Sequence, residues 1–140
     1  MITEIKWQDD FLVGIKEIDI LHKELLERIN LCIQGANGRL GKIKIDQLML
    51  SLFKYTQWHF RCEEALMGVY EYPEIKTHIE EHDDILILLG DEIKKVQTNM
   101  TYFQETPKFF LGWFGAHTLS SDMEMADYLR GTSHFVYAAN

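Results

Sequence analysis

The segment WHFRCEEALM, at residues 58–67, places polar side chains where a helix is normally apolar. His59 and Glu63 are four residues apart, so in a helix they lie one turn apart on the same face. Leu52 and Leu66 share that face, and their spacing predicts contact with the protein core. Burying an imidazole and a carboxylate is costly unless each is hydrogen-bonded or binds a cation. The segment therefore predicts a buried polar site within a helical protein.

Apolar residues recur every three or four positions in four separate segments of the chain. We expect helices at about residues 18–36, 43–68, 73–98 and 107–130, with an N-terminal arm at about residues 1–17 and a tail at residues 131–140. Pro73 is expected at the first position of the third helix, Thr106 at the N-cap of the fourth, and Gly131 at its C-cap. Residues 1–140 are predicted to form one all-α domain, in which short connections make neighbouring helices antiparallel. Its expected architecture is an up-down-up-down antiparallel four-helix bundle with an N-terminal arm.

The net charge and composition of the chain limit the classes of partner that it is expected to bind and its expected location. The 140 residues carry a formal net charge of −8, which disfavours binding to nucleic acid or to an anionic membrane surface. No signal peptide and no apolar run of about 18 residues is found, so we expect a cytoplasmic protein without membrane insertion. Cys32 and Cys62 are expected about 20 Å apart and hence unpaired. With 46% hydrophobic residues, the chain can form a core without disulfides.

Five of the six histidines lie on the apolar faces of the expected helices: His22, His59, His78, His82 and His117. Two residues on antiparallel helices lie at the same height when the turn between them is equidistant from both. For each pair of successive helices we take the midpoint between their groups, counting Glu63 with His59 and Asp122 with His117. The midpoints fall at about residues 41, 70 and 100, close to the expected turns. We therefore expect them to converge on one level of the interior, whereas His134 in the tail is expected on the surface.

Two pairs are spaced so that both members point to one place: His59 with Glu63, and His78 with His82. His117 and Asp122 are five residues apart, which corresponds to about 140° around an ideal helix. Either the aspartate reaches sideways or the helix widens locally, and both alternatives are open. Glu64 points about 100° away from its neighbour Glu63, which favours a surface or supporting role over metal ligation.

A metal centre would offset the cost of burying five imidazoles and two carboxylates together. One ion rarely takes seven protein ligands from four helices, whereas two ions bridged by the two carboxylates can share them. Nitrogen and oxygen ligands without a thiolate suit iron, manganese or zinc. The segment HIEEH at residues 78–82 is not the zinc-protease motif, because Ile79 stands where that motif needs glutamate.

At these residues the chain resembles the hemerythrin family, in particular the single-domain bacterial hemerythrins. The resemblance is carried by WQDDFLVGIKEIDILHKELLERIN, HFRCEEALM followed by YP, HIEEH and WFGAHTLSSD, which span most of the chain. It implies a non-haem di-iron centre, with an oxo or hydroxo bridge, that binds O2. By the resemblance, His78, His82 and His117 would hold one iron, His22 and His59 the other, and Glu63 and Asp122 would bridge them. The iron with two histidines would keep an open position for O2.

The segment after Trp113 departs from the family pattern, which commonly has leucine, two variable residues, histidine and isoleucine. This chain has Phe114, Gly115, Ala116, His117 and Thr118. We expect Phe114 and Thr118 to line the O2 pocket; if Thr118 faces it, the hydroxyl could donate a hydrogen bond there or admit water. Gly112 and Gly115 each cost about 1 kcal/mol in a helix relative to alanine, which indicates close helix packing or an access path.

Two carboxylates and five imidazoles favour milder chemistry than the carboxylate-rich sites of ferritin-like di-iron proteins. The expected function is therefore reversible O2 binding for carriage, storage or delivery, without an enzymatic role beyond weak peroxidase or oxidase activity. The alternatives are a di-iron redox enzyme that reduces O2, peroxide or nitric oxide, and an O2-sensing domain of a larger receptor. O2 is the expected ligand, an oxygen-consuming acceptor protein is compatible with delivery, and the sequence does not indicate the oligomeric state.

Overall fold

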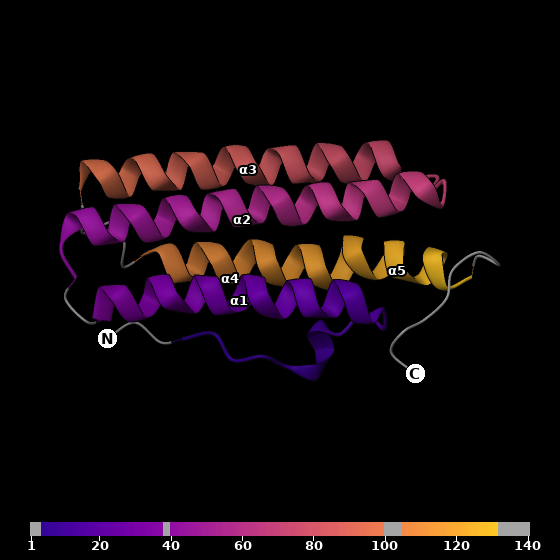
Figure 1. Ribbon diagram of the computed structural model, residues 1–140, viewed down its shortest axis with the longest axis horizontal. Coiled ribbons are helices and arrows are strands. Elements are labelled where there is room, and N and C mark those ends of the chain that lie inside the picture. The colour runs from indigo at the N-terminus through magenta and orange to yellow at the C-terminus, as the bar shows by residue number, and fades with distance from the viewer. Residues whose placement is uncertain (1–3, 38–39, 100–104, 132–140) are drawn as a thin grey trace.

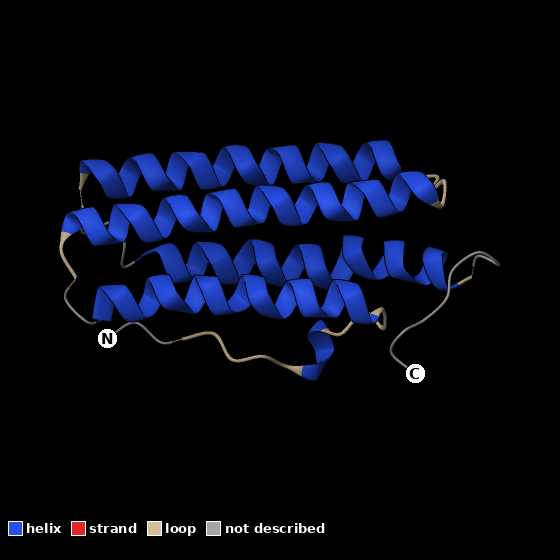
Figure 2. Ribbon diagram, in the orientation of Figure 1, coloured by secondary structure: helices blue, strands red, loops and turns tan. Residues whose placement is uncertain are grey.

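Four helices lie side by side in the computed structural model, which describes residues 4–37, 40–99 and 105–131 (Figure 1). In chain order the elements are η1 (Asp9–Phe11), α1 (Lys16–Asn37), α2 (Lys42–Val69), α3 (Ile75–Thr98) and a fourth helix in three parts, α4 (Thr106–His117), η3 (Thr118–Asp122) and α5 (Met123–Arg130). Successive helices run in opposite directions, and the described residues contain no strand (Figure 2). The expected all-α, up-down-up-down four-helix bundle is therefore confirmed.

The residues before α1 form an arm that runs back along that helix (Figure 1). The Asn30 side chain holds the beginning of the arm, because it accepts a hydrogen bond from the Ile5 N–H at 2.8 Å and donates one to the Ile5 carbonyl at 2.7 Å. Further along, Phe11 is buried in the core. The Asp19 carboxylate accepts hydrogen bonds from the Val13 N–H at 2.8 Å and from the Gly14 N–H at 3.2 Å, and these bonds fix the turn into α1.

The turn between α2 and α3 is longer than the sequence suggested. Glu71 adopts a φ of 53°, and the Ile75 N–H donates to the Tyr72 carbonyl at 3.2 Å, so the turn extends through Glu74. Pro73 lies inside this turn, and the expectation that it occupies the first position of the third helix is wrong. α3 begins at Ile75.

The ends of the fourth helix differ in how well they were expected. Glu105, and not Thr106, is the N-cap of α4, because the Thr106 hydroxyl instead donates across to the Glu92 carboxylate at 3.1 Å. At the other end, Gly131 is the C-cap of α5 as expected, and its N–H donates to the Asp127 carbonyl at 3.3 Å. His134 lies outside the described residues.

The interior contains two large apolar clusters with a layer of histidines between them. One cluster gathers Leu25, Ile29, Ile33, Met49, Leu89 and Phe110, among others, and the second gathers Ile15, Ile18, Met67, Met125 and Leu129. Full burial of each such side chain contributes about 1.5–3 kcal/mol to folding. The histidine layer lies toward the α2–α3 turn, because His78 is close to the start of α3 and Glu63 to the end of α2.

The structure also bears on the two cysteines and on the two glycines of the fourth helix. Cys32 is buried, Cys62 is partly buried, and both are free thiols. A Cβ added at Gly112 or Gly115 would meet no atom of another described element within 4 Å, so close packing against the described helices does not explain these glycines.

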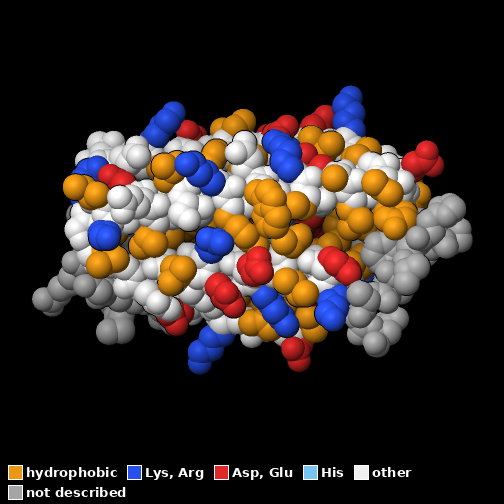
Figure 3. All heavy atoms as spheres, in the orientation of Figure 1, with side chains coloured by type: hydrophobic (Ala, Val, Ile, Leu, Met, Phe, Trp, Pro, Cys, Tyr) orange, Lys and Arg blue, Asp and Glu red, His pale blue; other side chains and the backbone are white. Residues whose placement is uncertain are grey.

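Charged side chains are interspersed over the face drawn in Figure 3, and hydrophobic side chains gather near its middle. On the face drawn in Figure 3, acidic and basic residues alternate, and no histidine is visible among the described residues. None of the helices in the described part of the chain is long and apolar enough to cross a membrane.

Candidate metal centre

All seven residues expected as metal ligands come together at one level of the bundle. They are His22 of α1, His59 and Glu63 of α2, His78 and His82 of α3, and His117 and Asp122 of the fourth helix. Each side chain is inside the protein, with at most 3% of the residue exposed. The convergence expected from equal distances to the turns is thus what the bundle produces.

Glu63 lies between two sets of histidines. Its Oε2 atom is 2.9 Å from His59 Nε2 and 3.1 Å from His22 Nε2. Its Oε1 atom is 3.1 Å from His82 Nε2, on the other side of the carboxylate. The two oxygens of Glu63 therefore face different groups of imidazoles.

Asp122 divides its oxygens in the same way. Its Oδ2 atom is 2.9 Å from His22 Nε2, whereas Oδ1 is 3.0 Å from both His78 Nε2 and His117 Nε2. The residues thus form two sides, which we name by their histidines: the three-histidine side (His78, His82, His117) and the two-histidine side (His22, His59). Each carboxylate directs one oxygen to each side.

The fourth helix reaches this geometry by widening. Thr118–Asp122 forms η3, a π-helical turn, between the α-helical segments α4 and α5. A π-helical turn contains more residues than an α-helical turn, and such turns are frequent at functional sites. Of the two alternatives left open by the spacing of His117 and Asp122, local widening is therefore the one the structure adopts.

Two acidic residues hold the far nitrogens of the three-histidine side. His82 Nδ1 lies 2.8 Å from Glu64 Oε2, and His117 Nδ1 lies 2.6 Å from Glu81 Oε1. The Ser121 hydroxyl donates to the other oxygen of Glu81 at 2.5 Å. Glu64 thus has a supporting place beside the centre, which was one of its two expected roles.

Sequence reasoning missed Glu81 and Ser121. Glu81 stands between the two histidines of HIEEH, and that position is the only signal it offers in the sequence. Its contact with His117 depends on which flank of α3 meets α4, which helical periodicity does not specify. Ser121 lies within η3, whose widened turn was itself undecided before the structure.

The imidazoles of the two-histidine side are held differently. His22 and His59 stack on each other with ring centroids 5.0 Å apart and planes 22° apart. Both Nδ1 atoms are buried, and neither has a hydrogen-bond partner among the described residues. These two rings are therefore oriented by packing and by the contacts of their Nε2 atoms with the carboxylates, without a hydrogen bond at Nδ1 among the described residues.

Charge compensation dominates the titration of the cluster. Burial alone would lower the pKa of His22, but its contacts with Asp122 and Glu63 and the charges of these carboxylates outweigh burial and raise it to about 10. The pKa of His117 is also raised to about 10, because the charge of Asp122 and the bonds to Asp122 and Glu81 outweigh burial.

The two carboxylates respond in the opposite sense. Burial and the charge of Asp122 favour the neutral form of Glu63, yet His59 and His22 hold its pKa well below the ordinary value. Burial likewise disfavours ionised Asp122, but its contacts with His117, His22 and His78 hold the pKa of Asp122 well below the ordinary value. Protonated imidazoles therefore balance ionised carboxylates when no cation is bound.

The donor set fits a pair of metal ions. Two groups of ligand atoms each lie within 4.8 Å of one another: Glu63, His78, His82, His117 and Asp122 form one, and His22, His59 and Glu63 form the other. Glu63 Oε1 and Asp122 Oδ2 are buried and make no hydrogen bond within the described part of the chain, since their contacts with imidazoles lack hydrogen-bond geometry. These oxygens retain acceptor capacity that a cation would use.

Phe114 and Thr118, expected to line an O2 pocket, are both buried beside this cluster, with 1% and 2% of each residue exposed. The Phe114 ring makes T-shaped contacts with two rings. Its centroid lies 6.2 Å from that of His22 and 5.2 Å from that of Phe11. Thr118 directly follows His117 as the first residue of η3. Phe114 thus borders the two-histidine side, while the orientation of the Thr118 hydroxyl toward a pocket stays a prediction.

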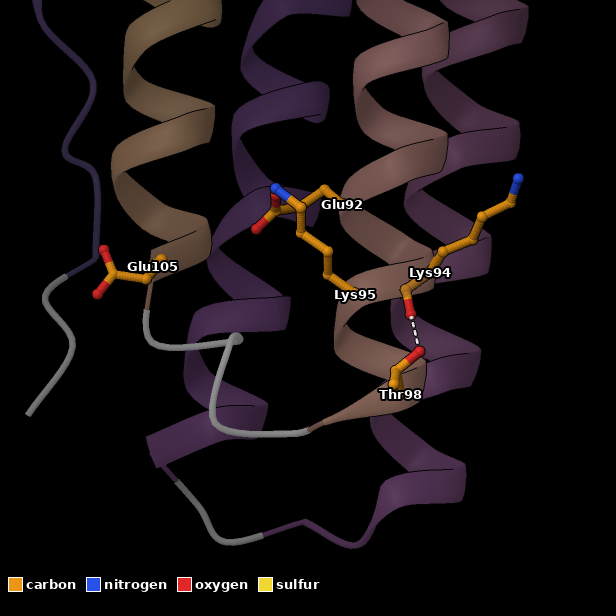
Figure 4. Close-up of a pocket in the computed structure, with 5 residues that line it drawn as sticks. All are labelled: Glu92, Lys94, Lys95, Thr98 and Glu105. Atoms are coloured by element: carbon orange, nitrogen blue, oxygen red, sulfur yellow. Dashed lines mark hydrogen bonds between the residues drawn. The ribbon is translucent and has the colours of Figure 1, made fainter.

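A surface hollow lies at the other end of the bundle, away from the histidines. It is lined by Glu92, Lys94, Lys95, Thr98 and Glu105, from the end of α3 and the start of α4 (Figure 4). The Thr98 hydroxyl donates to the Lys94 carbonyl at 2.9 Å, which caps the last turn of α3. Its lining is of mixed charge and contains no histidine, so we assign the chemistry of the protein to the buried cluster.

Comparison with known proteins agrees with this cluster. The family model described as "Hemerythrin HHE cation binding domain" matches residues 13–129. A bacteriohemerythrin of Clostridium acetobutylicum is 30% identical over 126 residues, which cover 86% of this chain and 98% of the relative. A bacteriohemerythrin of Pseudomonas paraeruginosa is 27% identical over 92% of this chain and 84% of the relative. Myohemerythrin-1 of Phascolopsis gouldii is 31% identical over 60% of this chain and 65% of the relative. The chain belongs to the hemerythrin family.

Proposed function

We propose that the protein binds O2 reversibly at a non-haem di-iron centre, in an oxygen-carriage, storage or delivery role. In this proposal His78, His82 and His117 would hold one iron, His22 and His59 would hold the other, and Glu63 and Asp122 would each offer an oxygen to both. Iron held by these residues would supply the electrons that reversible O2 binding requires. The proposal places the protein in the cytoplasm, where it can pass O2 to an oxygen-consuming acceptor protein.

The divided carboxylates are the observation that carries this proposal. Each of Glu63 and Asp122 directs one oxygen to the two-histidine side and the other to the three-histidine side, at 2.9–3.1 Å from the imidazole nitrogens. A mononuclear site would not need this arrangement, because one carboxylate oxygen suffices for one ion. Membership of the hemerythrin family gives independent support.

The residues of the chain have two tasks in this function. The histidines present Nε2 toward the interior, which is the nitrogen available for ligation when Nδ1 carries the proton. Phe114 packs against His22, Phe11 packs against Phe114 in turn, and both side chains are buried and apolar, which would disfavour water on this side. A dry pocket protects bound O2 from proton leakage and hydrolytic side reactions.

The site offers fewer carboxylates than the di-iron enzymes do. Ferritin-like di-iron proteins place four glutamates and two histidines around their metals. Here five imidazoles and two carboxylates are present, so the ferrous pair is the favoured state. This composition supports binding over oxygenase chemistry.

The decisive experiment is the visible absorption spectrum of the iron-loaded, dithionite-reduced protein before O2, after O2 and after argon purging. We expect an absorption band that appears with O2 and disappears under argon, over repeated cycles. Immediate and irreversible passage to the oxidised spectrum would refute reversible binding and favour a redox enzyme. An alanine variant of the exposed Gln57 on α2 is the matched control and should behave as the unmodified protein.

A further inference from the structure

The two sides of the centre differ in what lies behind their imidazole rings. An ionised carboxylate can only accept hydrogen bonds, so the contact of 2.8 Å from Glu64 requires the proton of His82 to be on Nδ1. The contact of 2.6 Å from Glu81 requires the same of His117. In both rings Nε2 is thereby the nitrogen that faces the other expected ligands.

These supports come from other helices than the rings they hold. Glu64 belongs to α2 and holds His82 of α3, and Arg61 forms an ion pair with Glu64 at the surface. Glu81 belongs to α3 and holds His117 of α4. Each support therefore fixes its ring relative to a second helix, and the ring of His82 is fixed further by stacking on Phe60, with centroids 3.8 Å apart.

The two-histidine side has no such supports within the described residues. When Nε2 of His22 or His59 binds a metal ion, Nδ1 must carry the proton. Both Nδ1 atoms are buried without an acceptor there, so the proton stays unsatisfied. Metal binding on this side therefore leaves buried donors unpaired, whereas on the other side two of the three rings have acceptors in place.

We infer that Glu64 and Glu81 are positioning residues that make the three-histidine side the tighter metal site, which fills before the two-histidine side. The inference rests on the two-ion centre proposed above. Carboxylates behind metal-binding histidines raise ligand basicity and fix the tautomer, and their removal costs 10–100-fold in metal affinity. The centre thus loads in a defined order set by residues outside the ligand set.

The test is a titration of the metal-free protein with cobalt(II), followed by calorimetry and by visible absorption. We expect two resolved binding events in the unmodified protein. E64Q and E81Q should each weaken the tighter event by about tenfold or more while leaving the weaker event within about twofold. The matched control is E80Q, since Glu80 is an exposed glutamate adjacent to Glu81 on the same helix and should change neither event.

A second variant locates the tighter event. His59→Ala removes a ligand of the two-histidine side only, so it should keep one equivalent of cobalt(II) with the affinity of the tighter event. Thermal unfolding of each metal-free variant shows that it is folded, and E64Q and E81Q give the answer even if His59→Ala is not.

Three results would overturn the inference. A tighter event unchanged in both E64Q and E81Q would remove the positioning role, and equal weakening of both events would indicate a general structural effect. Both leave the two-ion centre standing. One equivalent of cobalt(II) in the unmodified protein would instead overturn the two-ion centre, and with it both the proposed function and this inference.

Discussion

His117 Nε2 lies 3.0 Å from Asp122 Oδ1, although five residues separate the two positions along one helix. An α-helix would turn Asp122 about 140° away from His117. The π-helical turn η3 brings the two side chains back to one side of the helix. The fourth helix therefore supplies two groups to the centre because its backbone departs from α-helical geometry, and not because a side chain stretches.

Removal of one ligand should cost metal and stability together. His82→Ala leaves Glu63 Oε1 and Glu64 without their imidazole partner, which is expected to destabilise the metal-free protein by about 1–3 kcal/mol. The variant should bind less than two equivalents of iron, measured by metal analysis after anaerobic loading. Asp84→Ala, at an exposed position of the same helix, is the control. Two full equivalents in His82→Ala would contradict its assignment as a ligand.

Metal uptake should release protons. His22 and His117 both have a pKa of about 10 in the metal-free protein, so both are protonated at pH 8 and must each lose a proton to bind a metal ion. Apparent metal affinity should therefore rise with pH up to about 10. Calorimetry at pH 8 in buffers of different ionisation enthalpy measures the release, for which we expect about two protons per centre. An affinity independent of pH between 7 and 9 would contradict this.

The stability of the metal-free protein should have a defined pH window. His22 and His117 have a pKa raised from 6.5, so their contribution is complete below about 6.5 and is lost as the pH rises through about 10. Glu63 and Asp122 have a pKa lowered from 4.5 and 3.8, so their contribution is present above these values and is lost at more acidic pH. The melting temperature should peak between about 4.5 and 6.5.

The melting temperature of the metal-loaded protein, measured over the same pH range, serves as the comparison. Bound metal replaces the protons on the imidazoles, so the alkaline decline between pH 7 and 10 should be smaller with metal than without it. A metal-free protein that becomes more stable over that range would contradict the raised pKa values.

Replacement of the Thr118 hydroxyl should lengthen the life of the O2-bound state. Thr118→Val keeps the shape of a side chain that is only 2% exposed and removes its polar group. If the hydroxyl admits water or donates a proton, its loss slows autoxidation, by about tenfold for each 1.4 kcal/mol of barrier. The decay of the O2-induced band measures this rate. Ser120→Ala, exposed in the same π-helical turn, should leave the rate unchanged.

The two glycines of α4 should be replaceable with a gain in stability. A Cβ at Gly112 or Gly115 would enter open space, so alanine should add about 0.5–1 kcal/mol at each position by lowering the cost of helix formation. Chemical denaturation of the metal-free protein measures the gain. A loss of O2 binding in either variant, without a loss of stability, would instead identify an access path.

Gly14 provides the contrasting substitution. Its φ is +89°, and a Cβ there would lie 2.7 Å from the Arg130 guanidinium, so Gly14→Ala should destabilise the protein. A stabilising effect at Gly14 would show that backbone conformation and contact do not govern glycine replacement in this chain.

The helices and the clustering of the expected ligand residues were predictable because both follow one period. Residues three and four positions apart share a helix face, so His78 and His82 could be placed on one face of their helix from spacing alone. Equal distance from a turn then placed the helices in register. These arguments need no knowledge of how the helices rotate about their own axes.

The features that escaped prediction depend on that rotation or on local backbone choices. Glu81 reaches His117 only because its flank of α3 meets α4, and Glu64 could not be divided between a surface and a supporting role. The turn containing Pro73 is longer than expected because Glu71 adopts a left-handed conformation, which its residue type does not announce.

The contact of 2.9 Å between His22 and Asp122 joins the first helix of the bundle to the last, with one hundred residues of chain between them. Helices adjacent in sequence meet by closing short loops, whereas the contact between α1 and the fourth helix closes a much longer stretch of chain, at a higher entropic cost. Ions shared by these residues would act as a cross-link placed where the chain topology is least local. Occupied by metal, the centre should slow unfolding far more than it speeds folding, because its ligands assemble only when the last helix has docked.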